Sequence, residues 1–123
     1  MKRRELFGTA AVLSLGAGTL LVPAAFRPVR AQAKWRVGFS QVTTIEPWRV
    51  QFNKDIKAEA AKHPEVELLI SDGEDRTEKQ VADVENFITQ QVDALLVSPK
   101  ESAGLTGVVE KAIDAGIPVF VLD

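Results

Sequence analysis

An acidic, an aromatic and a basic residue lie close together where the first predicted helix begins: Glu46, Trp48 and Arg49. An indole ring packs against the apolar C–H face of a sugar ring, and a guanidinium donates hydrogen bonds to neighbouring hydroxyl oxygens. A carboxylate accepts from such hydroxyls, and Asp123 could supply one. A structural role fits equally well, in which Trp48 packs under the helix, Arg49 is a solvated charge and Asp123 caps the next turn.

The elements that must position these residues alternate along the chain. Four apolar β-type runs alternate with three helical patterns, which is typical of a parallel sheet with crossover helices. Three of the runs are continuously apolar, as expected for strands that helices cover on both faces. We therefore predict a doubly wound α/β fold with strands at residues 35–40, 66–71, 94–98 and 118–122.

Each predicted helix has recognisable ends and an apolar stripe. The first begins at Pro47, which suits a first helical turn, and stops before Pro64. The second begins with a capping-box pattern that runs from Thr77 to Gln80, and the third ends where Gly116 can adopt the left-handed conformation. The stripes consist of Phe52, Ile56 and Ala60, then Val81, Val84 and Ile88, then Leu105, Val108, Val109 and Ala112.

Ligands of open parallel sheets bind beyond the carboxyl ends of the strands. These ends carry Ser40 and Gln41, then Asp72, then residues 98–100, and finally Asp123. Ser40 and Gln41 could face a ligand or complete hydrogen bonds at the strand end, and both roles stay open. Asp72 opens a charged turn that we expect to be mostly solvated, with Asp72 or Glu74 as a peripheral contact at most. The candidate ligand-binding residues are Ser40, Gln41, Glu46, Trp48, Arg49, Asp72 and Asp123.

The first 33 residues have the pattern of an export signal. The run from Lys2 to Arg4 is basic, the stretch from Leu6 to Phe26 is uncharged, and the sequence from Ala31 to Ala33 fits a signal-peptidase site. A membrane anchor is the alternative, but glycine, proline and many alanines lower the hydrophobicity of the stretch. We expect cleavage after Ala33 and a folded region over residues 34–123.

The basic start resembles a twin-arginine export signal. In that signal two arginines precede a short hydrophobic pair, as they do between Arg3 and Phe7. Arg27 and Arg30 near the cleavage point would suit the same route. The lysine that the pattern expects is replaced by Gly8, so an ordinary secretory signal remains open.

Composition argues against several kinds of site. The chain has no Cys and one His, which removes disulfides, thiol nucleophiles and cysteine-based zinc sites. Residues 34–123 carry ten basic and sixteen acidic side chains, a net charge of −6 that disfavours binding to nucleic acid. The first strand is followed by no glycine-rich phosphate loop, and no nucleophile stands with a base. We expect no metal, cofactor or catalysis; an exported α/β enzyme is the less favoured alternative.

Motifs spread over residues 34–123 resemble one family. They are the run from Val37 to Gln41, Trp48-Arg49, Asp72-Gly73, Val92-Asp93-Ala94, Pro99 and the run from Ile117 to Asp123. In order and spacing they are similar to the N-terminal lobe of type I periplasmic sugar-binding proteins, in particular the galactofuranose-binding and ribose-binding group.

The resemblance implies a periplasmic binding protein-like I fold with strand order 2-1-3-4 and an incomplete N-terminal lobe over residues 34–123. It also implies that Trp48 and Arg49 contact a sugar and that Asp123 holds its hydroxyls. The family usually continues with an arginine that grips the same sugar and with a second lobe. We therefore expect this chain to represent part of a longer protein.

The implied function is that of the substrate-binding component of a bacterial ABC-type sugar importer. Such a protein is a periplasmic monomer that captures a monosaccharide and delivers it to membrane permease subunits. The alternative is a periplasmic sugar sensor that presents its ligand to a chemoreceptor or a sensor kinase. Either partner would bind the sugar-closed form, so both readings stay open at the level of sequence.

Overall fold

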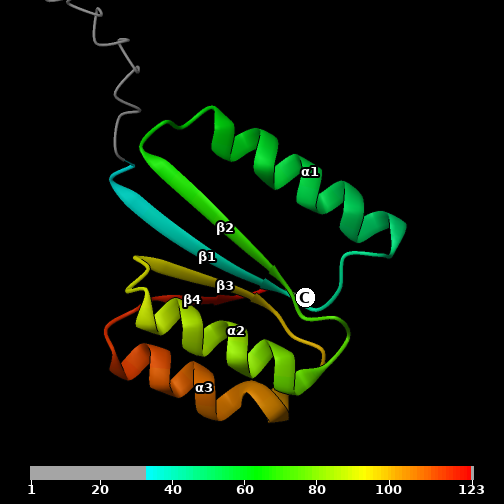
Figure 1. The fold of residues 1–123 in the computed structure, drawn as a ribbon, viewed down its shortest axis with the longest axis vertical. Helices are drawn as coiled ribbons and strands as arrows, with labels where there is room; N and C mark the ends of the chain where they lie inside the picture. The colour runs from blue at the N-terminus through cyan, green and yellow to red at the C-terminus, as the bar shows by residue number, and fades with distance from the viewer. Residues whose placement is uncertain (1–32, 123) are drawn as a thin grey trace, which may run out of the picture. The chain divides into compact units, whose positions relative to one another are not determined.

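The computed structural model describes residues 33–122, so the predicted export signal lies outside the described residues except for Ala33. Four parallel strands form one sheet in the order β2-β1-β3-β4 (Figure 1). This confirms the predicted fold class and strand order. The strands are β1 (Trp35–Gln41), β2 (Val66–Asp72), β3 (Ala94–Ser98) and β4 (Val119–Val121).

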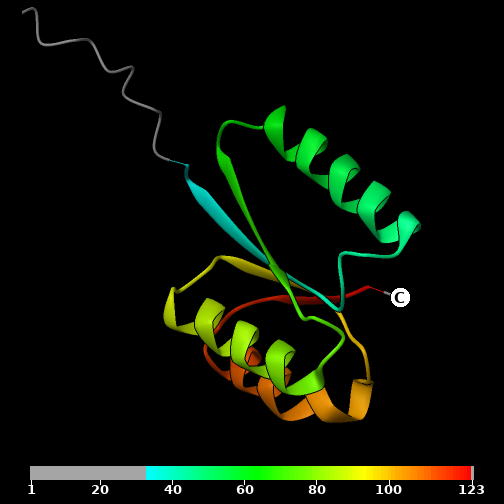
Figure 2. The same cartoon turned by 45° about the vertical axis from the view of Figure 1, so that its right-hand side comes forward.

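Helices cover both faces of the sheet. Helix α1 (Pro47–Ala61) lies on one face, whereas α2 (Thr77–Thr89) and α3 (Ser102–Asp114) lie side by side on the other (Figure 2). This is the doubly wound arrangement that the alternation of elements predicts. Within the described range, no helix has the combination of length and apolarity that crossing a membrane requires.

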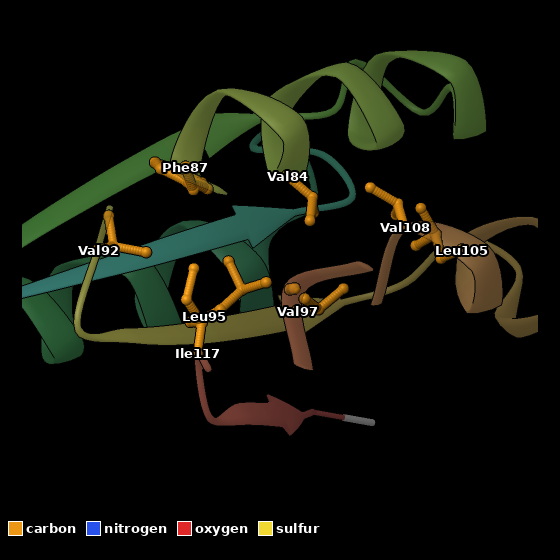
Figure 3. Packing of buried hydrophobic residues seen from close by; sticks show 9 residues of the cluster. Val84, Phe87, Val92, Leu95, Val97, Leu105, Val108 and Ile117 are labelled. Atoms are coloured by element: carbon orange, nitrogen blue, oxygen red, sulfur yellow. The ribbon is translucent and has the colours of Figure 1, made fainter. Parts of the chain in front are cut away.

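The hydrophobic core lies between the sheet and the pair α2 and α3 (Figure 3). Side chains from α2, β3 and α3 interdigitate there, which is why the stripes predicted for these two helices are mostly buried. The chain leaves α3 through Gly116, whose φ of 82° confirms the predicted left-handed residue. The core residues are Val84, Phe87, Val92, Leu95, Val97, Leu105, Val108, Ala112 and Ile117.

Two elements are more exposed than the sequence predicts. Strand β4 was expected to be covered on both faces, yet Phe120 is 55% exposed, because β4 lies at the edge of the sheet and α1 packs over β2 at the opposite side. On α1 the one buried residue is Asn53. Phe52 is 37% exposed, and its ring meets that of Phe39 edge-on, with ring centroids 5.8 Å apart.

The capping box predicted at the start of α2 is wrong. Arg76 occupies the N-cap position and forms no side-chain cap hydrogen bond, so Thr77 is already the first helical residue. The Gln80 side chain does not reach back to the helix start. It turns into the interior and bonds to β1, β3 and the loop after β3.

Gly38 allows α2 to pack directly on the backbone of β1. A Cβ atom at this position would lie 2.7 Å from Cγ of Phe87, which is closer than real Cβ atoms approach their neighbours. Phe87 belongs to the core and has little room to move. The missing side chain of Gly38 therefore fixes the distance between helix and sheet.

We predict that Gly38→Ala lowers the free energy of unfolding by roughly 1–3 kcal/mol, because overpacking a filled core forces backbone shifts. Gly107→Ala is the matched control: no atom lies within 4 Å of its added Cβ, and the helical position is exposed. It should raise stability by roughly 0.5–1 kcal/mol through helix propensity. Urea unfolding followed by circular dichroism measures both changes, and equal signs for the two variants would contradict the packing argument.

Candidate binding site at the carboxyl ends of the strands

The register of the sheet aligns the ends of three strands. Gln41 pairs with Asp72 on one side and with Ser98 on the other. The arrowheads of these strands accordingly lie at one edge of the sheet, where the loops to the three helices begin (Figure 1). This edge, formed by the ends of β1, β2 and β3 and the loops that follow them, is called the rim below.

Ser40 and Gln41, both candidate ligand contacts, are buried beneath the rim. Ser40 Oγ accepts a hydrogen bond from Gln80 Nε2 at 3.3 Å. Gln41 Nε2 donates to Asn53 Oδ1 at 3.1 Å, and Gln41 Oε1 accepts from the Val42 amide at 3.2 Å. Both side chains are at most 1% exposed. In this structure they therefore support the rim from below, and direct contact with a ligand stays a prediction.

Arg49 is held on the rim by two hydrogen bonds. Its Nη1 atom donates to Gln41 Oε1 at 2.7 Å and to Ser98 Oγ at 2.9 Å, so the guanidinium bridges the ends of β1 and β3. The side chain is only 16% exposed. The interpretation of Arg49 as a freely solvated charge is therefore wrong, because this arginine is fixed by partners from two strands.

Glu46 and Trp48 flank the guanidinium. Arg49 Nε lies 2.9 Å from Glu46 Oε2, but the N–H group does not point at that oxygen, so the contact is an ion pair rather than a hydrogen bond. The Trp48 ring stacks on the guanidinium, with its centroid 4.1 Å from Cζ. Trp48 is 56% exposed, which excludes the alternative in which it packs under the helix.

Arg49 retains donor capacity beyond these contacts. A guanidinium carries five N–H donors, of which Nη2 supplies two. Within residues 33–122, Nη2 forms no hydrogen bond. The rim thus combines an ordered cation that can donate further hydrogen bonds, an exposed aromatic ring and a half-exposed carboxylate. Such groups can pack against the apolar face of a polyhydroxylated ring and form hydrogen bonds with its hydroxyls.

The Asp72 carboxylate accepts hydrogen bonds from the loops after β1 and β2. One carboxylate oxygen accepts from the Thr44 hydroxyl, and the other accepts from the Glu74 amide at 2.8 Å. Asp72 therefore ties the loop after β1 to the loop after β2, where Glu74 and Asp75 have left-handed φ values of 53° and 56°. The rest of this turn is charged and exposed, as the sequence predicts, and a peripheral ligand contact of Asp72 remains a prediction.

Asp123, the third predicted group, lies outside the described residues. The residue before it pairs with the end of β3, because the Leu122 amide donates to the Val97 carbonyl at 2.8 Å. The proposed contact of Asp123 with hydroxyl groups therefore stays a prediction that rests on its position directly after β4.

Sequence reasoning missed the buried amides of Asn53 and Gln80, which connect the helices to the rim. A signal for Gln80 exists, because it precedes Val84 and Phe87 by four and seven residues and so lies on their stripe. A polar residue on a buried stripe indicates an internal hydrogen-bond network. Asn53 gives a weaker signal, since the apolar pattern of α1 is itself weak.

Comparisons with known proteins identify the family of the chain. The model of the periplasmic binding protein domain family matches residues 37–123. The chain is 39% identical to the galactofuranose-binding protein YtfQ of Escherichia coli (strain K12) over 83% of its own length and 32% of that protein. It is 37% identical to the ribose import binding protein RbsB of Bacillus subtilis (strain 168), over 73% of the chain and 29% of the relative.

A solved structure has the same fold. The fructose-binding periplasmic domain of the hybrid two-component system BT1754 superposes with a TM-score of 0.69 at 36% identity, over 72% of this chain and 29% of that one. The chain thus spans about a third of the length of the relatives that it matches. A parallel sheet of order β2-β1-β3-β4 with a polar rim, together with the family match over residues 37–123, shows that this chain belongs to the periplasmic binding protein domain family.

Proposed function

We propose that the protein carrying this chain is the substrate-binding component of a bacterial ABC-type sugar importer. It captures a monosaccharide in the periplasm and delivers it to the permease subunits as a monomer. The observation that carries the proposal is the Arg49 guanidinium, fixed at the end of β1 and β3 beside the exposed ring of Trp48. The galactofuranose-binding and ribose-binding relatives support a sugar as the ligand.

The proposed roles follow from the contacts in the rim. Arg49 donates from Nη2 to sugar hydroxyl oxygens, and Trp48 supplies apolar ring surface for sugar C–H groups. Asp123, placed after β4, accepts from hydroxyls, and Glu46 keeps the guanidinium charge compensated until a ligand arrives. Ser40, Gln41 and Asp72 act from beneath or beside the ligand as supports. Turnover of the sugar is not part of the proposal, because the relatives are sugar-binding proteins.

The structural similarity to a fructose-binding domain of a two-component system favours a second candidate function. In that case the sugar-loaded protein presents its ligand to a sensor kinase or a chemoreceptor rather than to a permease. Deletion of the gene separates the two. Loss of uptake of a radiolabelled sugar indicates import, whereas unchanged uptake with loss of sugar-dependent transcription or chemotaxis indicates sensing.

We predict that Arg49→Lys weakens sugar binding by about ten- to a hundredfold, since hydrogen bonds to a charged group contribute about 1.5–3 kcal/mol. Trp48→Ala and Asp123→Ala should each weaken binding as well. Isothermal titration calorimetry of the full gene product with D-ribose, D-galactose, D-fructose and L-arabinose measures the change. Wild-type affinity in Arg49→Lys would refute the assigned site.

Arg36→Lys is the matched control for that experiment. Arg36 also binds a carboxylate, Glu67, with Nε 3.1 Å from Oε2, but it lies at the amino end of β1. Its replacement should leave the affinity for sugar unchanged. If none of the four sugars binds to the wild-type protein, the sugar-binding proposal itself fails.

We further propose that residues 1–33 direct export and are removed near Ala33. The expected result is that the protein recovered from the periplasm begins at Lys34, which intact-mass spectrometry of the purified protein shows directly. Conversion of Arg3 and Arg4 together to lysine should block export if the twin-arginine route is used, and leaves it intact if the general secretory route is used. An uncleaved, membrane-bound product would contradict the proposal and favour an anchor.

A further inference from the structure

The amide of Gln80 joins three separate parts of the rim. It is completely buried, with 0% of the residue exposed. Its Nε2 donates to Ser40 Oγ at 3.3 Å and to the Ser98 carbonyl at 2.9 Å, and its Oε1 accepts from the Lys100 amide at 2.9 Å. A single side chain of α2 therefore satisfies groups at the end of β1, at the end of β3 and in the loop before α3.

The third loop of the rim packs against the same side chain. A Cβ atom added to Gly73 would lie 2.5 Å from Gln80 Cγ and 2.9 Å from the Val42 carbonyl oxygen. The loop after β2 therefore lies in close contact with both the Gln80 stem and the backbone after β1. Since α2 begins in that loop, the position of the amide and the course of all three loops are coupled.

Gln80 is linked to Arg49 through Ser98. The carbonyl of Ser98 accepts from Gln80, while its hydroxyl accepts from Arg49 Nη1. Without the amide, the carbonyl of the buried residue Ser98 and the Lys100 amide, whose hydrogen bond is partly buried, would lose their partner, and the end of β3 would shift to find others. The Ser98 hydroxyl would shift with it, so one of the two hydrogen bonds that fix Arg49 would be lost.

We propose that Gln80 is a positioning residue for the ligand site: it never touches the ligand and sets the affinity by fixing the end of β3 and, through Ser98, the Arg49 guanidinium. This inference rests on the proposed sugar-binding function. Its physical basis is preorganisation, because an arginine that is already held in place loses less conformational entropy when a ligand binds.

The competing explanation is that Gln80 only docks α2 on the sheet. Two variants distinguish a role of Gln80 in positioning Arg49 from a role in docking α2, and both from a general loss of stability. Gln80→Met keeps the size of the side chain but removes all three hydrogen bonds. Val84→Ala is the matched control, because Val84 is equally buried on α2 and belongs to the hydrophobic core, away from the hydrogen-bond chain.

The first test needs no sugar. Arg49 Nε is buried, so its N–H group should give a slowly exchanging resonance in a ¹H–¹⁵N spectrum of the full gene product. Arg49→Lys assigns the resonance by removing it. Gln80→Met should shift or broaden this resonance and leave that of Arg36, at the opposite end of β1, unchanged, whereas Val84→Ala should affect neither. An unchanged Arg49 resonance in a folded Gln80→Met protein overturns the proposal.

The second test is a double-mutant cycle on sugar affinity. Using whichever of D-ribose, D-galactose, D-fructose and L-arabinose the wild-type protein binds, Gln80→Met should weaken binding about tenfold when Arg49 is present. In the Arg49→Lys background the same change should cost less than about twofold, because its route to the ligand is already broken. Equal losses in both backgrounds, or a comparable loss in Val84→Ala, would show a merely structural role.

The variant Gln80→Asn covers the case in which Gln80→Met does not fold. It keeps a neutral amide in the buried site, but the shorter side chain carries that amide one methylene away from Ser98 and Lys100, so it should reproduce both effects. Wild-type behaviour of Gln80→Asn in both tests overturns the proposal. If no sugar binds to the wild-type protein, the proposed sugar-binding function fails, and so does the predicted effect of Gln80 on sugar affinity. The Arg49 resonance then decides by itself whether Gln80 positions Arg49.

Discussion

The need to satisfy polar groups at the buried ends of three parallel strands shapes this molecule. Parallel pairing ends β1, β2 and β3 at the same level, and the helices that cover the sheet exclude water from Ser40 and Gln41. Each buried donor or acceptor left unpaired there would cost about 1–3 kcal/mol. Asn53 of α1 and Gln80 of α2 supply the hydrogen-bond partners. The helices are therefore attached to the sheet by side-chain amides at the rim and by apolar contacts elsewhere.

The rim and the core are consequently one construction. Gly38 and Gly73 are positions where a backbone needs to approach a side chain of α2, Phe87 in the core and Gln80 at the rim. Both contacts lie along the same helix. The packing of α2 in the core therefore also fixes the position of the Gln80 amide relative to the rim. The side chains of such a binding site are held in place by the packed helices and sheet, which are more rigid than a free loop.

The fold could be predicted from the sequence, because apolar runs and helix ends are local patterns. Pro47 at the start of the first helix and Gly116 after the third are two clear examples. The rim was only partly predictable. Glu46, Trp48 and Arg49 could be selected because they are adjacent in sequence, but the partners of Arg49 come from β1 and β3, and their pairing depends on register. Gln80 was misread as a helix cap, since the local pattern fits a cap and the competing partners lie 18 to 40 residues away.

The stacking of Trp48 on Arg49 restricts how any ring-shaped molecule can use both residues. One face of the indole is covered by the guanidinium at 4.1 Å. A second ring on the opposite face, at the roughly 3.5–4 Å of close packing, would lie about 8 Å from the guanidinium carbon. That separation is well beyond the roughly 3 Å of a hydrogen bond. A small ligand that contacts both residues in this arrangement therefore has to approach the stacked pair from the side. It then touches the edge of the indole ring and the edge of the guanidinium, rather than lying on the face of either.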